Sequence, residues 1–117
     1  MELNEYQNLS KRTMPEPNRN GHSYRYTGMD KSNYAMGLAG EAGEVVDLIK
    51  KEVHHGHPSH PLGVKEELGD LMHYVAGVAT MYGLTLEEIC SDNIAKLKKR
   101  FPDGFNTTDS IKRVDVK

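Results

Sequence analysis

The chain has 117 residues with a formal net charge of −2 at pH 7, and 37% of the residues are hydrophobic. A chain of this length buries roughly two-thirds of its surface on folding, which predicts one compact domain, and the near-balanced charge excludes a general polyanion-binding surface. The single cysteine excludes an internal disulfide framework, and the lack of a signal pattern or of an apolar run of about 20 residues predicts a cytoplasmic protein without a membrane partner.

The N-terminal half of the sequence predicts two helices separated by a loop. Apolar residues at helical spacing predict a short helix near the N-terminus, which ends before Pro15. Residues 14–28 lack apolar periodicity and are rich in Pro, Asn, Gly, His and Tyr, so they predict a loop long enough to have a function. Asp30 or Ser32 is the expected cap of a second helix that continues to about Glu52.

The C-terminal half predicts two further helices. A wide apolar stripe predicts the third helix from Leu62 or Val64 to Tyr82, and the glycine that follows is a typical C-terminal signal. A capping-box pattern that begins at Thr85 predicts a fourth helix, which ends near Arg100.

These elements predict the fold class and the domain organisation. No segment alternates apolar and polar residues as a strand does, so we expect an all-α protein, most simply a four-helix bundle. The helical domain is expected to occupy residues 1–105, followed by a polar C-terminal tail at 106–117. The short link between the second and third helices favours an antiparallel hairpin. Apolar faces that one chain does not cover predict a homo-oligomer, either a dimer or a tetramer.

Two pairs of acidic residues are the most informative feature of the sequence: Glu41 with Glu44, and Glu67 with Asp70. Residues three apart share a helix face, and the hairpin would bring the two pairs opposite each other. Ionised carboxylates beside apolar residues need a compensating charge, and oxygen ligands from two helices suit Mg²⁺, with Mn²⁺ as a substitute. The pattern predicts a metal–phosphate site, in which a carboxylate left uncoordinated is a candidate general base. Solvated helix faces also carry such pairs, so either pair alone has an ordinary structural explanation.

Four segments that carry these residues resemble a known family: GLAGEAGEVVDLIKK, EELGDLMHYVAGVA, GLTLEEI and NIAKLKKRFPDGF. They resemble the MazG-like nucleoside triphosphate pyrophosphohydrolases, of the all-α NTP pyrophosphatase type, over roughly residues 30–105. The family pattern is Glu-x-x-Glu followed by Glu-x-x-Asp. MazG proper often has another Glu immediately before the first pair, where this chain has Gly40, so the number of metal ions stays open.

The resemblance implies Mg²⁺-dependent hydrolysis of an NTP or dNTP to the monophosphate and pyrophosphate, for nucleotide-pool control and with a preference for deoxynucleotides. It implies that the two acidic pairs are the metal ligands and the catalytic carboxylates. It also assigns contacts with the nucleotide substrate to four further residues: Tyr74, Asn93, Lys96 and Arg100. Packing in the core would explain Tyr74 equally well. A position on a solvated helix face would explain Lys96 nearly as well.

Several other hypotheses remain at this level. A related enzyme would act on a specialised nucleotide such as phosphoribosyl-ATP, and a protein of another class would be a noncatalytic helical oligomerisation module. An RNA-binding protein is disfavoured because the chain lacks an extended basic surface, so no nucleic-acid partner is expected. A zinc site is disfavoured for the histidines of the second turn, which lie in a Gly/Pro-interrupted segment without a cysteine partner: His54, His55, His57 and His60.

Overall fold

The computed structural model describes residues 1–17 and 26–116, and within these ranges it contains helices and no β-strand. The all-α prediction is therefore confirmed. In chain order the elements are α1 (Leu3–Ser10), the 3-10 turn η1 (Lys11–Thr13), α2 (Gly28–His54), α3 (Pro61–Met81), α4 (Leu86–Arg100) and α5 (Thr107–Lys112). None of the helices in the described ranges is long and apolar enough to cross a bilayer. Most of the expected loop at 14–28 lies outside the described residues.

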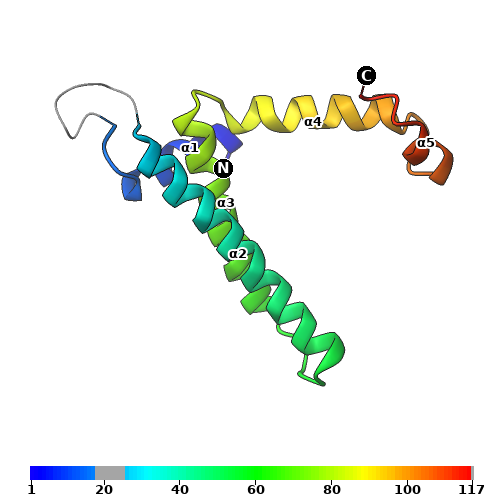
Figure 1. Cartoon of the computed structure of the whole chain (residues 1–117), viewed down its shortest axis with the longest axis horizontal. Coiled ribbons are helices and arrows are strands. Elements are labelled where there is room, and N and C mark those ends of the chain that lie inside the picture. Colours follow the sequence, from blue (N-terminus) through cyan, green and yellow to red (C-terminus); the bar gives the residue numbers. More distant parts are fainter. Residues whose placement is uncertain (18–25, 117) are drawn as a thin grey trace.

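Helices α2 and α3 form an antiparallel hairpin, which we call the α2–α3 hairpin (Figure 1). The cap of α2 differs from the prediction, because Thr27 is the N-cap and Asp30 is the third residue of the first turn. The Thr27 hydroxyl accepts a hydrogen bond from the Asp30 amide at 3.1 Å, and the Asp30 carboxylate accepts one from the Thr27 amide at 3.0 Å. This reciprocal capping box starts α2 at Gly28, earlier than either predicted cap allowed.

Helix α3 begins one residue before the predicted range. His60 is its N-cap, with Nδ1 accepting a hydrogen bond from the Gly63 amide at 3.2 Å, and Pro61 occupies the first helical position. Proline is well suited to that position, because its fixed φ is helical and its missing N–H would be unpaired there. At the other end Gly83 has a φ of 70°, as expected for a glycine that ends a helix.

Helix α1 lies at the corner where α3 turns into α4, and its polar side chains fix that corner. The amide of Gln7 is buried; its Nε2 donates to the Leu84 carbonyl at 2.8 Å and to Thr80 Oγ1 at 3.0 Å. Its Oε1 accepts from the Leu86 amide at 2.7 Å. Gln7 therefore satisfies the first backbone N–H of α4, which begins at the predicted capping box of Thr85.

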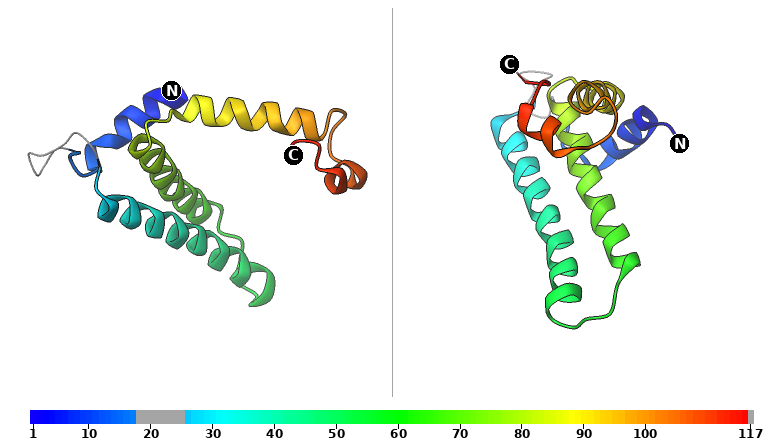
Figure 2. Two further views of the ribbon diagram at one scale, coloured as in Figure 1. Left: turned by 45° about the horizontal axis from the view of Figure 1, so that its top comes forward. Right: turned by 90° about the vertical axis from the view of Figure 1, so that its right-hand side faces the viewer.

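Helix α4 projects away from the α2–α3 hairpin and packs mainly on α1 (Figures 1 and 2). The radius of gyration is 17.8 Å, whereas a compact chain of this length has about 13 Å. The fully buried core is correspondingly small and consists of two clusters, Met14 with Tyr34 and Met81, and Ala76 with Ala79 and Leu86. The chain by itself does not close a four-helix bundle.

The expected polar tail contains a short helix. Asn106 Oδ1 accepts a hydrogen bond from the Asp109 amide at 2.8 Å and caps α5. The segment is tied back to α4, because Arg100 Nη2 donates to Ser110 Oγ at 3.3 Å and Arg100 Nε lies 3.6 Å from Asp115 Oδ1. A side-chain cap and an ion pair thus give this segment its structure. Neither interaction requires an apolar periodicity, so the helix could not be recognised from the sequence pattern.

Candidate functional site

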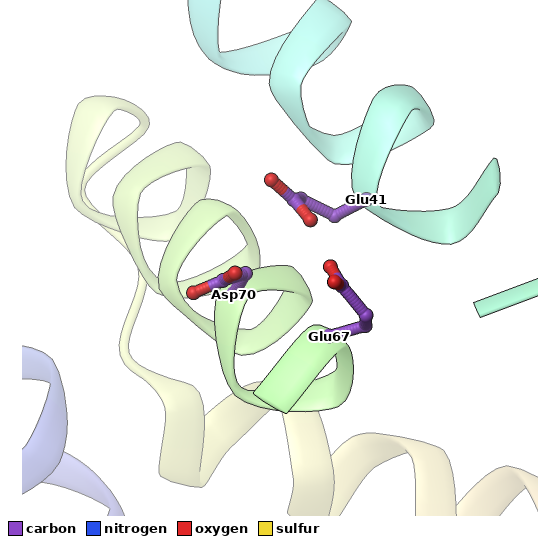
Figure 3. Close-up of side chains that lie close together, drawn as sticks. All are labelled: Glu41, Glu67 and Asp70. Atoms are coloured by element: carbon purple, nitrogen blue, oxygen red, sulfur yellow. The ribbon is translucent and has the colours of Figure 1, made fainter. Parts of the chain in front are cut away.

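Three of the four predicted carboxylates meet between the two helices of the hairpin. Glu41 comes from α2, and Glu67 and Asp70 come from α3 (Figure 3). One carboxylate oxygen of each lies within 4.8 Å of the others. We call these residues the acidic cluster. The antiparallel register of α2 and α3 places them opposite each other, as the sequence pattern predicted for the two acidic pairs.

The acidic cluster carries unfavourable charge repulsion. The pKa of Glu67 is raised above its ordinary value, first by its interaction with the Glu41 carboxyl group and then by desolvation and the charges of Glu41, Asp70 and Glu66. Carboxylates this close favour proton uptake by one of them. A bound cation would remove the need for that proton.

The spacing and chemistry of the acidic cluster fit a hard divalent cation. Two oxygen ligands on opposite sides of a Mg²⁺ ion are about 4.2 Å apart, twice the ordinary Mg–O distance. The oxygens of the cluster, all within 4.8 Å of one another, need only a small contraction to bind one ion together. Oxygen ligands without nitrogen or sulfur favour Mg²⁺ or Mn²⁺ over zinc. Among the described residues, the turn histidines form no group close enough to hold a metal ion with other ligand side chains.

The fourth predicted carboxylate, Glu44, lies outside the acidic cluster. It is exposed on α2, one turn beyond Glu41. Its charge raises the pKa of Lys51, although the main cause of that raised pKa is the Lys51–Asp47 hydrogen bond, with Nζ 2.7 Å from Asp47 Oδ2. Glu44 is therefore close to the acidic cluster in sequence but is not one of the three carboxylates that meet there.

Aromatic side chains fill the interface of the hairpin next to the acidic cluster. Tyr74, one turn after Asp70, packs against Tyr34 of α2 with ring centroids 5.1 Å apart. The Tyr34 hydroxyl is 3.2 Å from His73 Nε2, and burial raises the pKa of Tyr34. Tyr34 was not among the predicted site residues. Its spacing could have identified it, because it lies seven residues before Glu41 on the same face of the helix.

The predicted nucleotide contacts on α4 do not reach the acidic cluster within one chain. Asn93 and Lys96 are exposed on α4, which points away from the hairpin (Figure 1). The Arg100 guanidinium is engaged by Ser110 and Asp115. Of the four predicted substrate contacts, only Tyr74 lies on the hairpin itself.

Comparisons with known proteins identify a family for the region that carries the acidic cluster. The sequence model of the MazG nucleotide pyrophosphohydrolase domain matches residues 30–105, a range that contains the whole α2–α3 hairpin apart from its first turn, together with all of α4. The gene 37 protein of Mycobacterium phage L5 is 34% identical over 77 residues, which cover 62% of this chain and 68% of that protein. No solved structure is significantly similar to the chain.

Proposed function

The chain belongs to the MazG nucleotide pyrophosphohydrolase family, and we propose that it hydrolyses a nucleoside triphosphate to the monophosphate and pyrophosphate. The observation that carries the proposal is the convergence of Glu41, Glu67 and Asp70 from two helices inside the matched region. We propose a preference for deoxynucleoside triphosphates and a role in controlling the cytoplasmic nucleotide pool, on the resemblance to small MazG-like enzymes.

In this proposal Mg²⁺, or Mn²⁺ in its place, is held by the acidic cluster, with Glu44 available as a fourth ligand. When bound, the cation would neutralise charge on the phosphates and lower the pKa of a water molecule. The chain itself supplies carboxylates on two packed helices, which would hold the cation. Glu44, where it is not a ligand, is our proposed acceptor for the proton of the attacking water.

Substrate contacts beyond the acidic cluster are proposed for Tyr74, Asn93, Lys96 and Arg100. Tyr74 is adjacent to the cluster along α3, whereas the three α4 residues are remote from it within one chain. Lysine and arginine on α4 suit phosphate oxygens. For these residues to act at the acidic cluster, the α4 of another copy must lie over the hairpin.

We therefore include a homo-oligomer, a dimer or a tetramer, in the proposed function. The exposed apolar side chains of α4 support it, with Ile94 51% and Leu97 39% exposed. The outer side of α2 has a matching apolar row, in which Val46 is 63% and Val53 62% exposed. Exposed apolar faces on helices are typical of association surfaces.

The test is pyrophosphate release from dNTPs, NTPs, phosphoribosyl-ATP and guanosine tetraphosphate, each with Mg²⁺, Mn²⁺ or EDTA. Metal-dependent release from one group supports the enzyme and identifies its substrate class. Glu67→Gln should abolish this release, and Glu66→Gln is the matched control, because Glu66 is the exposed neighbour that lies outside the cluster. No release from any substrate, with folded protein shown by circular dichroism, would instead favour a noncatalytic helical oligomerisation module.

A further inference from the structure

Two tyrosines cross the α2–α3 interface in opposite directions, and each lies against a glycine of the facing helix. The ring of Tyr74 from α3 covers Gly37 of α2, and the ring of Tyr34 from α2 covers Gly77 of α3. A Cβ added at either glycine would fall within 3.0 Å of ring atoms, a distance that real Cβ atoms essentially never reach. The two rings also contact each other edge to face at a centroid distance of 5.1 Å.

These contacts lie directly beside the acidic cluster. Gly37 is one turn before Glu41 on α2, and Tyr74 is one turn after Asp70 on α3. In the antiparallel hairpin the Gly37–Tyr74 contact therefore forms one layer of the interface between the helices. The carboxylates form the next layer, one helical turn away. Any change in the distance between the helices at this layer is transmitted to the carboxylates about 6 Å away, because helices are stiff over one turn.

Three other glycines of the hairpin have no such neighbours. A Cβ added at Gly40, Gly43 or Gly69 would meet no atom within 4 Å. A glycine inside a helix lowers stability relative to an alanine. At Gly37 and Gly77 this cost is offset by the close approach of a tyrosine ring, whereas at Gly40 an alanine would fit.

We infer that the Gly37–Tyr74 and Gly77–Tyr34 contacts set the separation of α2 and α3 that allows Glu41 to share a cation with Glu67 and Asp70. These four residues are positioning residues, and the inference rests on the proposed metal site. A methyl group at Gly37 must push the Tyr74 ring or the helices apart. The oxygens of the acidic cluster already span up to 4.8 Å, and a shared Mg²⁺ allows about 4.2 Å, so further separation prevents joint binding.

The experiment measures Mn²⁺ affinity of the full chain by titration calorimetry, without nucleotide. Gly37→Ala should weaken Mn²⁺ binding by about tenfold or more, as expected when a residue that orients metal ligands is changed. Gly40→Ala is the matched control, since it adds the same methyl group to the same helix beside Glu41 but into open space, and it should bind Mn²⁺ as the wild type does. In the double variant Gly37→Ala/Tyr74→Ala the added methyl group no longer meets the ring, so the losses of affinity in Gly37→Ala and Tyr74→Ala alone should not add up.

The outcomes separate this inference from the proposed function. A wild-type protein that binds no Mn²⁺ would overturn the metal site itself. If the wild type binds Mn²⁺, three results would overturn the positioning role alone: unchanged affinity in Gly37→Ala, an equal loss in Gly40→Ala, or losses that add up in the double variant. If Gly37→Ala does not fold, Tyr74→Leu decides, because it keeps the glycine and removes the ring. Weaker Mn²⁺ binding in folded Tyr74→Leu supports the inference, and wild-type affinity contradicts it.

Discussion

The carboxyl groups of Glu41 and Glu67 come from opposite helices of the hairpin and lie close together, with one oxygen of each within 4.8 Å of the other (Figure 3). Their interaction is the largest cause of the raised pKa of Glu67, ahead of desolvation and the charges of Glu41, Asp70 and Glu66. Carboxylates this close favour proton uptake when no cation is bound. Cation binding and proton binding are competing ways to relieve the same repulsion.

The first prediction concerns pH. Since the folded-state pKa of Glu67 is raised above its ordinary value of 4.5, its contribution to stability is complete below that value and is lost as pH rises through the folded-state pKa. Protein in EDTA should lose stability over this range, whereas Mg²⁺ should increase the melting temperature more at pH 7 than at pH 5. Melting curves with EDTA and with Mg²⁺ test this. Glu67→Gln should reduce both pH effects, and identical curves for the variant and the wild type would refute the assignment.

The second prediction separates Glu44 from the acidic cluster. Glu41→Gln, Glu67→Gln and Asp70→Asn should each weaken Mn²⁺ binding by about tenfold or more, because each removes a clustered ligand. Glu44→Gln should change Mn²⁺ affinity less and lower kcat by about 100-fold, as loss of a general base does. Calorimetry and pyrophosphate release on the same preparations provide the two readouts. If Glu44→Gln weakens Mn²⁺ binding as much as Glu41→Gln does, Glu44 is a direct ligand in solution.

The sequence predicted the acidic pairs but not their unequal geometry, for a reason that lies in helix periodicity. Residues three apart are about 60° apart around a helix, so they share a face only approximately. Glu41 points toward α3, while Glu44 is turned toward solvent beside Lys51. Broad apolar stripes determine which helices pair. The directions of side chains at the edge of the contact depend instead on how each helix is rotated about its own axis.

The direction of α4 also could not be derived from periodicity. Capping at Thr85 and the turn at Gly83 were predicted correctly because they depend on local residues. The angle between α3 and α4 instead depends on Gln7, a residue 79 positions before its partner Leu86. A polar residue in a short amphipathic helix gives no sign that it is buried.

The third prediction tests that corner. Gln7→Leu should lower the free energy of unfolding by about 2 to 3 kcal/mol, because it leaves the buried Leu86 amide and the Leu84 carbonyl without their partner. Urea unfolding followed by circular dichroism measures the change. Asn8→Ala, on the exposed side of the same helix, should stay within about 0.5 kcal/mol of the wild type. Equal effects of the two variants would show that the Gln7 contacts do not stabilise the corner.

The fourth prediction distinguishes two roles of Arg100. In the structure its guanidinium contacts Ser110 and Asp115, whereas the proposed function assigns it to substrate phosphate. Asp115→Asn weakens the structural contact but keeps the arginine, and Arg100→Ala removes both roles. If Arg100 also binds phosphate, Arg100→Ala should raise KM by about tenfold, because a charged hydrogen bond to the substrate is lost. Asp115→Asn should leave KM unchanged. If both variants have the same KM, Arg100 contacts only the C-terminal segment and does not bind the substrate phosphate.

The fifth prediction concerns association through α4. Leu97 is on the exposed apolar face of this helix, and Ala95 is about 200° away around it at 3.6 residues per turn. Leu97→Glu and Ala95→Glu change the charge equally, but only the first places a carboxylate in the proposed interface. Analytical ultracentrifugation should show a wild-type dimer or tetramer, a largely dissociated Leu97→Glu and an intact Ala95→Glu. If the α4 residues act at the acidic cluster of another copy, as proposed, Leu97→Glu should also raise KM for the nucleotide. A monomeric wild type with full activity would contradict both the interface and the shared site.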